Sequence, residues 1–159
     1  MTKLVGILSL TLIGFTSCAT SWLPRQEGVL WASVASKATF SLGELTIATR
    51  PTTGNLKQTA TDLARLAARN AGVPLDESAP GLAYRLSLYL EERDFGVDID
   101  TYNSVVVVLK AWSPGDSPRQ VGQVIYAEET KKTLRSANYL SQALQAVFVQ
   151  FAKTLKDAP

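Results

Sequence analysis

The chain has 159 residues, of which 46% are hydrophobic and 19% are charged, so it holds enough apolar material for one domain. A formal charge of +2 provides no electrostatic footprint for nucleic acid. Histidine is absent, which excludes Ser-His-Asp catalysis, Cys-His catalysis and His-ligated zinc. The single cysteine excludes an internal disulfide.

The first 17 residues have the pattern of a secretory signal peptide. Lys3 supplies a positive start, and residues 4–15 form a 12-residue apolar run. This run is too short for a membrane-spanning helix, which needs about 20 apolar residues. We therefore expect residues 1–17 to be removed during export.

Cys18 follows the apolar run, and Phe15-Thr16-Ser17-Cys18 resembles the lipobox of bacterial lipoproteins. Phe15 departs from the family's Leu, whereas the next three residues match. The resemblance implies that Cys18 begins the mature chain and carries a diacylglyceryl thioether and an amide-linked chain such as palmitate. Two or more acyl chains give stable anchoring. Ala19 in place of Asp is compatible with sorting to the outer membrane. The alternative is a secreted protein with a cysteine near its cleavage site.

Residues 18–28 show no periodicity and contain Pro24 and Gly28, which predicts a short tether after the lipidated cysteine. We expect residues 29–157 to form a single domain. In its first part, the residue pattern predicts a strand at 44–50, and we expect another near 29–40. An apolar stripe then predicts a helix that begins after Asn55.

The second half of the domain contains three strand patterns and one helix pattern. Alternating apolar residues predict a strand from Leu82 to Glu91, and further strands are predicted at 102–112 and 121–129. Ser136 is a suitable N-cap for a final helix that extends beyond Leu155.

The order of these elements, β-α-β-β-β-α, predicts an α+β fold. Because each helix has a single apolar stripe, we expect a two-layer sandwich in which both helices cover one face of a mainly antiparallel sheet of about four strands. The run from Val105 to Leu109 is apolar on both faces. This pattern indicates a central strand that is covered on both sides or has a second buried surface.

Three aspartates define a candidate metal site. Asp94, Asp98 and Asp100 flank Gly96, and a turn there would bring their carboxylates together. Carboxylate oxygens are the ligands that Ca²⁺ prefers, although this spacing does not match an EF-hand loop. A solvated hairpin end is the alternative interpretation.

A small basic cluster, Lys131, Lys132 and Arg135, precedes the final helix. Such cations can contact anionic lipid head groups or glycolipid phosphates. A solvated loop is the alternative interpretation.

Motifs of common enzyme classes are missing from the sequence. No two glycines have Gly-x-Gly spacing, no Gly-x-x-x-x-Gly-Lys occurs, and no serine lies in a Gly-x-Ser-x-Gly or Ser-x-x-Lys pattern. We therefore assign no catalytic residue and no cofactor apart from the covalent lipid on Cys18, and we expect a non-enzymatic protein.

The lipobox-like start and the element order from Val29 to Leu155 resemble the small envelope lipoproteins of the LptE type, and also the auxiliary lipoproteins of ABC-type lipid transporters. The resemblance implies an outer-membrane lipoprotein that faces the periplasm and binds a membrane protein, either a barrel or a transporter, in envelope assembly or in lipid or lipopolysaccharide transport. Two other functions stay open. One is a carrier that holds a lipid ligand between helices and sheet, and the other is a Ca²⁺-dependent hydrolase.

Overall fold

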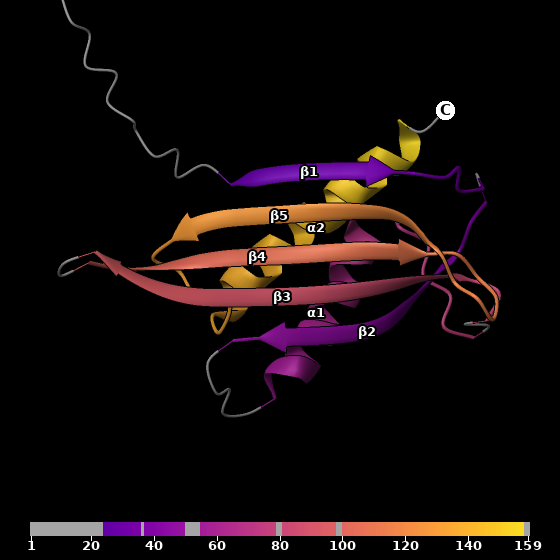
Figure 1. The fold of residues 1–159 in the computed structure, drawn as a ribbon. Helices are drawn as coiled ribbons and strands as arrows, with labels where there is room; N and C mark the ends of the chain where they lie inside the picture. Colours follow the sequence, from indigo (N-terminus) through magenta and orange to yellow (C-terminus); the bar gives the residue numbers. More distant parts are fainter. Residues whose placement is uncertain (1–23, 36, 50–54, 79–80, 98–99, 158–159) are drawn as a thin grey trace, which may run out of the picture.

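The computed structural model describes residues 24–35, 37–49, 55–78, 81–97 and 100–157, and the side chains of residues 95–101 are not described. These residues form five strands and two helices in the order ββαβββα (Figure 1). Their bounds are β1 (Arg25–Leu30), β2 (Phe40–Ala48), α1 (Leu56–Asn70), β3 (Tyr84–Val97), β4 (Asp100–Trp112), β5 (Gln120–Thr130) and α2 (Ala137–Lys156).

The strands form one mixed sheet in the order β1-β5-β4-β3-β2. The pairings β1–β5, β4–β5 and β3–β4 are antiparallel, whereas β2 and β3 are parallel. A parallel pair requires a crossover, and α1 provides it between β2 and β3. The predicted α+β class is confirmed, with one strand more than expected and with one parallel pairing.

Both helices lie on the same face of the sheet, as the sequence predicted (Figure 1). The two helices pack against each other, and α2 also contacts β1, β4 and β5. The core lies between the layers, where Phe148 and Phe151 of α2 and Leu88 and Leu90 of β3 are almost fully buried. Phe40 of β2 packs edge-on against Phe151, with ring centroids 5.4 Å apart.

The predicted tether was too long at its C-terminal end. Residues 25–28 belong to β1, which pairs with β5 from Arg25↔Ala127 to Leu30↔Gly122. The segment lacks apolar alternation because β1 is an edge strand with exposed polar side chains. Gly28 allows it to lie close to α2, since a Cβ at this position would collide with the hydroxyl of Thr154.

Leu82 also differs from the prediction. It was expected to share the inward face with the next leucines of the alternating run, but it precedes β3 and is 83% exposed. Leu86, Leu88 and Leu90 are in the core as predicted. The strand therefore begins two residues later than the alternation indicates.

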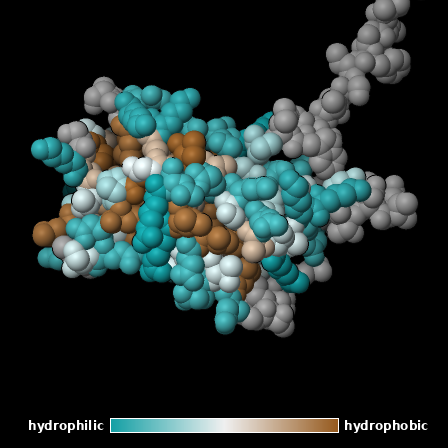
Figure 2. Space-filling view, turned by 180° about the vertical axis from the view of Figure 1, so that it is seen from behind, coloured by the Kyte–Doolittle hydropathy of each residue, from teal (hydrophilic) through white to brown (hydrophobic). Residues whose placement is uncertain are grey.

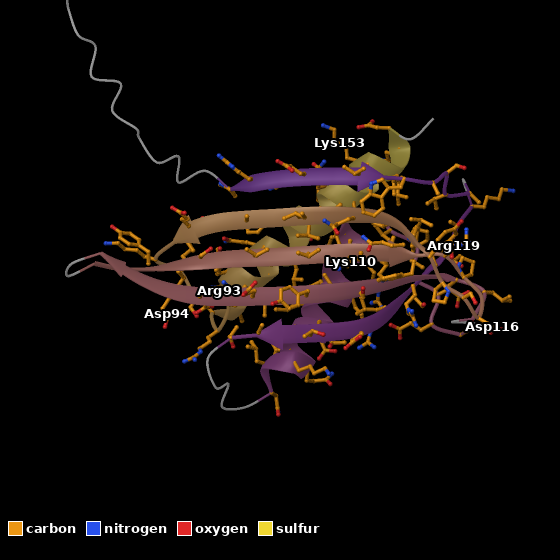
Figure 3. The ribbon with its side chains drawn as sticks, in the orientation of Figure 1. Arg93, Asp94, Lys110, Asp116, Arg119 and Lys153 are labelled. Atoms are coloured by element: carbon orange, nitrogen blue, oxygen red, sulfur yellow. The ribbon has the colours of Figure 1, made fainter. Side chains whose placement is uncertain are left out.

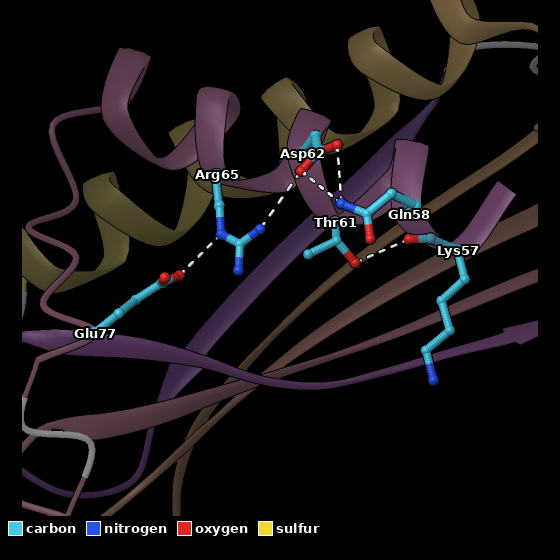
Figure 4. A network of polar contacts seen from close by, with 6 residues as sticks. All are labelled: Lys57, Gln58, Thr61, Asp62, Arg65 and Glu77. Carbon is cyan, nitrogen blue, oxygen red and sulfur yellow. Dashed lines mark hydrogen bonds and ion pairs between the residues drawn. The ribbon is translucent and has the colours of Figure 1, made fainter. Parts of the chain in front are cut away.

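The outer surface of α1 carries a polar network that connects the helix to the segment that follows it (Figure 4). Arg65 Nε donates to Glu77 Oε1 at 2.9 Å, and the amide of Gln58 donates to Asp62 at 3.1 Å. Seen from the helix side, hydrophobic residues are interrupted by hydrophilic ones (Figure 2). Leu66 of α1 and Val149 of α2 are among the exposed apolar side chains.

Candidate functional site

The face of the sheet that points away from the helices is the candidate functional surface, which we call the open face (Figure 1). Its central row consists of three cross-strand partners, Tyr89 of β3, Val108 of β4 and Ile125 of β5. Val106 and Trp112 of β4 also lie on this face, and all five side chains are half-buried. No helix in the described part of the chain covers this row.

The open face exists because β4 is apolar at consecutive positions. Val105, Val107 and Leu109 are fully buried beneath the helices. Since side chains alternate along a strand, Val106 and Val108 point to the other side. The predicted central position of this strand is confirmed. Its second side, predicted to be covered or buried, is only half-buried at Val106 and Val108.

A hollow of about 250 Å³ lies on the open face near the C-terminal end of β4. Trp112 and Ser87 join β4 to β3 at this hollow, because the indole Nε1–H donates to the Ser87 hydroxyl oxygen at 2.9 Å. This hydrogen bond fixes the orientation of the ring. The hollow is lined by Glu44, Thr46, Ser87, Leu88, Tyr89, Val108, Lys110 and Trp112.

The two charged side chains that line the hollow, Glu44 and Lys110, differ in their contacts. The Thr46 hydroxyl donates to Glu44 Oε1 at 3.3 Å. Lys110 lies on β4 (Figure 3). Within the described part of the chain, Lys110 forms neither a hydrogen bond nor an ion pair through its ammonium group. The candidate site therefore combines two aromatic rings with a cation that is available to a partner.

A second polar cluster, which was not predicted from the sequence, joins β5 to α2. Tyr126 and Tyr139 donate hydrogen bonds to Glu128 Oε2, at 2.5 Å and 2.6 Å. Burial raises the pKa of both phenols above the ordinary value, and the hydrogen bonds to Glu128 raise it further. The available signal was the spacing of Val124, Tyr126 and Glu128, which places a carboxylate on the core-facing side of the strand.

Glu92 has a comparable structural role at the same end of the sheet. Its carboxylate accepts hydrogen bonds from the Thr133 hydroxyl at 2.9 Å and from the Leu134 amide at 2.6 Å. These bonds attach the segment before α2 to β3. Glu92 and Glu128 are thus each engaged in contacts that hold elements together.

The predicted basic cluster lies in the segment that connects β5 and α2. The ammonium group of Lys131 lies 4.9 Å from the centre of the Tyr102 ring, and that of Lys132 lies 5.4 Å from the centre of the Tyr139 ring. Arg135 is exposed, and its amide donates to the Thr133 hydroxyl oxygen at 3.2 Å. Two of the three cations therefore contact aromatic rings, and head-group contact stays a prediction.

The predicted metal site falls largely outside the described side chains. Asp94 is exposed on β3, Asp98 is not described, and Asp100 begins β4 with its side chain not described. The described residues contain no group of three or more metal-ligating side chains. The Asp94, Asp98 and Asp100 site stays a prediction.

Cys18 and the rest of the predicted signal peptide also lie outside the described residues. Among the helices that the structure does describe, none has the length and apolar character needed to cross a membrane.

No family model and no curated protein matches this chain. Its fold is similar to a PelC dodecamer subunit from Paraburkholderia phytofirmans, with a TM-score of 0.55, 15% identity and coverage of 82% of this chain and 98% of that chain. A DUF4136 family protein from Bacteroides thetaiotaomicron gives a TM-score of 0.48 at 11% identity, covering 83% and 95% of the two chains. A minor lipoprotein from Acinetobacter baumannii gives 0.32 at 12% identity, covering 74% and 87%. The PelC likeness shows a shared α+β fold.

Proposed function

We propose that this chain is a non-enzymatic lipoprotein of the outer membrane, anchored through Cys18, whose domain faces the periplasm. Its open face binds a membrane-protein partner that acts in envelope assembly or in lipid or lipopolysaccharide transport. The barrel or transporter partner follows the LptE-type resemblance of the sequence.

The observation that carries this proposal is the half-buried apolar row on the open face. Tyr89, Val108 and Ile125 lie side by side on the three central strands. An antiparallel sheet face that is exposed to water ordinarily carries polar side chains. Contiguous apolar residues on such a face are typical of protein interaction surfaces. The apolar row would be buried by a partner protein.

A lipid anchor on Cys18 would hold the folded domain near the membrane. β1 begins at Arg25, seven residues after Cys18, so the connecting segment spans at most about 25 Å. A tether of this length keeps the domain close to the bilayer surface. Membrane proteins are then within reach of the domain.

The structural neighbours are consistent with a binding role. The PelC chain is described as a dodecamer, so this fold forms contacts between subunits in that protein. This observation supports a protein-binding role for the present chain.

A lipid-carrier function has less support. The space between the helices and the sheet is filled by core side chains, among them Phe148 and Leu144, which are fully buried. The hollow near Trp112 lies on the opposite side of the sheet. The Ca²⁺-dependent hydrolase would use the carboxylates of residues 91–100, and among these Glu92 is engaged in structural hydrogen bonds.

Site-specific photo-crosslinking tests the proposal. A photoreactive phenylalanine analogue at Val108 should give a defined adduct with an envelope membrane protein in intact cells. The same analogue at Leu66, which is 49% exposed on α1, should not. Equal adducts from both positions, or none from Val108, would contradict the proposed binding surface.

A further inference from the structure

We propose that the hollow beside Trp112 receives an acidic side chain of the partner protein, with the Lys110 ammonium group as its ion-pair partner. This inference rests on the proposed function, because the hollow is continuous with the apolar row of the open face. It adds the chemistry by which the partner is recognised.

The position of Lys110 carries the first part of the argument. Its cross-strand partners are Ser87 on β3 and Gln123 on β5, so it lies in the middle of the sheet. The residue is half-buried, and no described carboxylate lies within ion-pair distance of it. Close pairs of opposite charge at protein interfaces have favourable coupling energies in measured cases.

A second cation lies on the same face, on the strand next to Trp112. Arg85 is the cross-strand partner of Trp112 and has no ion pair within the described chain. Its aliphatic stem lies against Gly43 of β2, where an added Cβ would approach Cγ at 2.6 Å and Cδ at 2.8 Å. The glycine thus leaves room for the stem. Arg85 and Lys110 together favour an anionic partner group.

The aromatic lining supports a protein partner. Trp112 and Tyr89 line the hollow, and the hydrogen bond to Ser87 holds the indole ring in place. Trp, Tyr and Arg are enriched among the residues that dominate binding energy at protein interfaces. A hollow of 250 Å³ is slightly smaller than the usual range for small-molecule pockets, and it can accept one side chain.

The charges also argue that the occupant is a different protein. If two copies packed with their hollows facing each other, Lys110 and Arg85 of one copy would lie near the same cations of the other. Like charges brought together at an interface are unfavourable. Glu44, the one carboxylate among the residues that line the hollow, could offset only one of these two cations across such an interface. A partner with more acidic than basic groups therefore fits this face better than a second copy does.

Carbodiimide cross-linking of isolated envelopes tests this inference, because it joins a lysine amine directly to a contacting carboxylate. Mass spectrometry should find Lys110 linked to an Asp or Glu of another protein. Lys110→Arg keeps the charge but removes the reactive amine, so this adduct should disappear. Lys57→Arg on α1, at an exposed lysine away from the open face, should leave the adduct unchanged.

The Val108 photo-adduct separates this inference from the proposed function. Lys110→Glu should reduce that adduct on the order of tenfold or more, because reversal of an interfacial charge is costly. Suppose that Lys110→Glu leaves the Val108 photo-adduct unchanged and that no carbodiimide adduct forms through Lys110. The ion pair between Lys110 and an acidic partner side chain would then be overturned, while the proposed function would stand. If the protein without the Lys110 substitution forms no adduct with another protein, the proposed function is overturned. A Lys110 adduct to a second copy of this chain would overturn the assignment to a different protein.

Discussion

Tyr126 of β5 and Tyr139 of α2 donate their hydroxyl hydrogens to the same oxygen, Oε2 of Glu128. The two tyrosines are both buried, and the carboxylate between them connects the sheet to the helix layer. Lys132 lies over the Tyr139 ring, so a cation is also close to this cluster. The arrangement explains how a carboxylate is tolerated on the core-facing side of β5.

Removing the carboxylate should destabilise the fold. Glu128→Ala leaves two buried hydroxyl groups without their acceptor, and each such loss costs about 1–3 kcal/mol. Urea unfolding should therefore show a free energy of unfolding lower by about 2–6 kcal/mol. Glu129→Ala, at the exposed neighbouring position, should change it by less than about 0.5 kcal/mol. Equal effects of the two substitutions would show that the shared hydrogen bonds contribute nothing.

The same cluster should make stability sensitive to alkaline pH. The pKa of both tyrosines is raised in the folded state, so their contribution is fully present below the unfolded pKa of about 10. Above that pH the unfolded chain loses phenol protons that the folded chain keeps, and each tyrosine lowers stability by up to about 1.4 kcal/mol per pH unit. From pH 8 to pH 11, the free energy of unfolding of the unsubstituted protein should fall more steeply than that of the double variant Tyr126→Phe/Tyr139→Phe. That variant keeps all lysines, so parallel curves would contradict the account.

Close packing of β1 on α2 should make Gly28 intolerant of a side chain. In Gly28→Ala the new methyl group collides with the Thr154 hydroxyl, and overpacking of this kind costs about 1–3 kcal/mol. Thr154→Ala in the same protein should restore part of the loss. Gly81→Ala, where a Cβ meets nothing within 4 Å, is the matched control. Thermal unfolding that ranks the two glycine variants equally would exclude the close contact.

Elements that depend on local residue patterns could be predicted from the sequence, whereas features that depend on long-range contacts could not. Strands β3 to β5 and both helices follow from residue alternation and helical periodicity. β1 was missed at its start because Arg25, Gln26 and Glu27 are polar, as an edge strand permits, and its pairing with β5 is a long-range contact. The parallel pairing of β2 with β3 likewise depends on the crossover of the whole chain.

The candidate site was predictable only in outline. The run from Val105 to Leu109 indicated a central strand with a second buried side, and the structure places that second side on the open face, where it is only half-buried. The hollow was not predictable, because Glu44, Ser87 and Trp112 lie on three different strands. Only the register of strand pairing brings them together. Glu128 had a local signal, because its position two residues after Tyr126 places both side chains on the core-facing side of β5.

Lipid anchoring predicts a simple change in location. Cys18→Ser removes the thiol that would carry the diacylglyceryl group, so the protein should move from the membrane pellet to the soluble fraction of the periplasm. Immunoblots of cell fractions measure this directly, and labelling with a fatty-acid analogue should be lost in the same variant. A Cys18→Ser protein that keeps the fatty-acid label would contradict anchoring through this residue.

The most direct test of the proposed function is complementation of a deletion strain with a chain whose open face carries a new charge. Val108→Lys places an ammonium group in the centre of the apolar row, and Leu66→Lys places one on the exposed surface of α1. Outer-membrane permeability to a large antibiotic is measured in both strains at equal protein levels. The account predicts that deletion weakens the barrier, that Leu66→Lys restores it and that Val108→Lys does not. Full restoration by a folded Val108→Lys protein would contradict the open face as the binding surface.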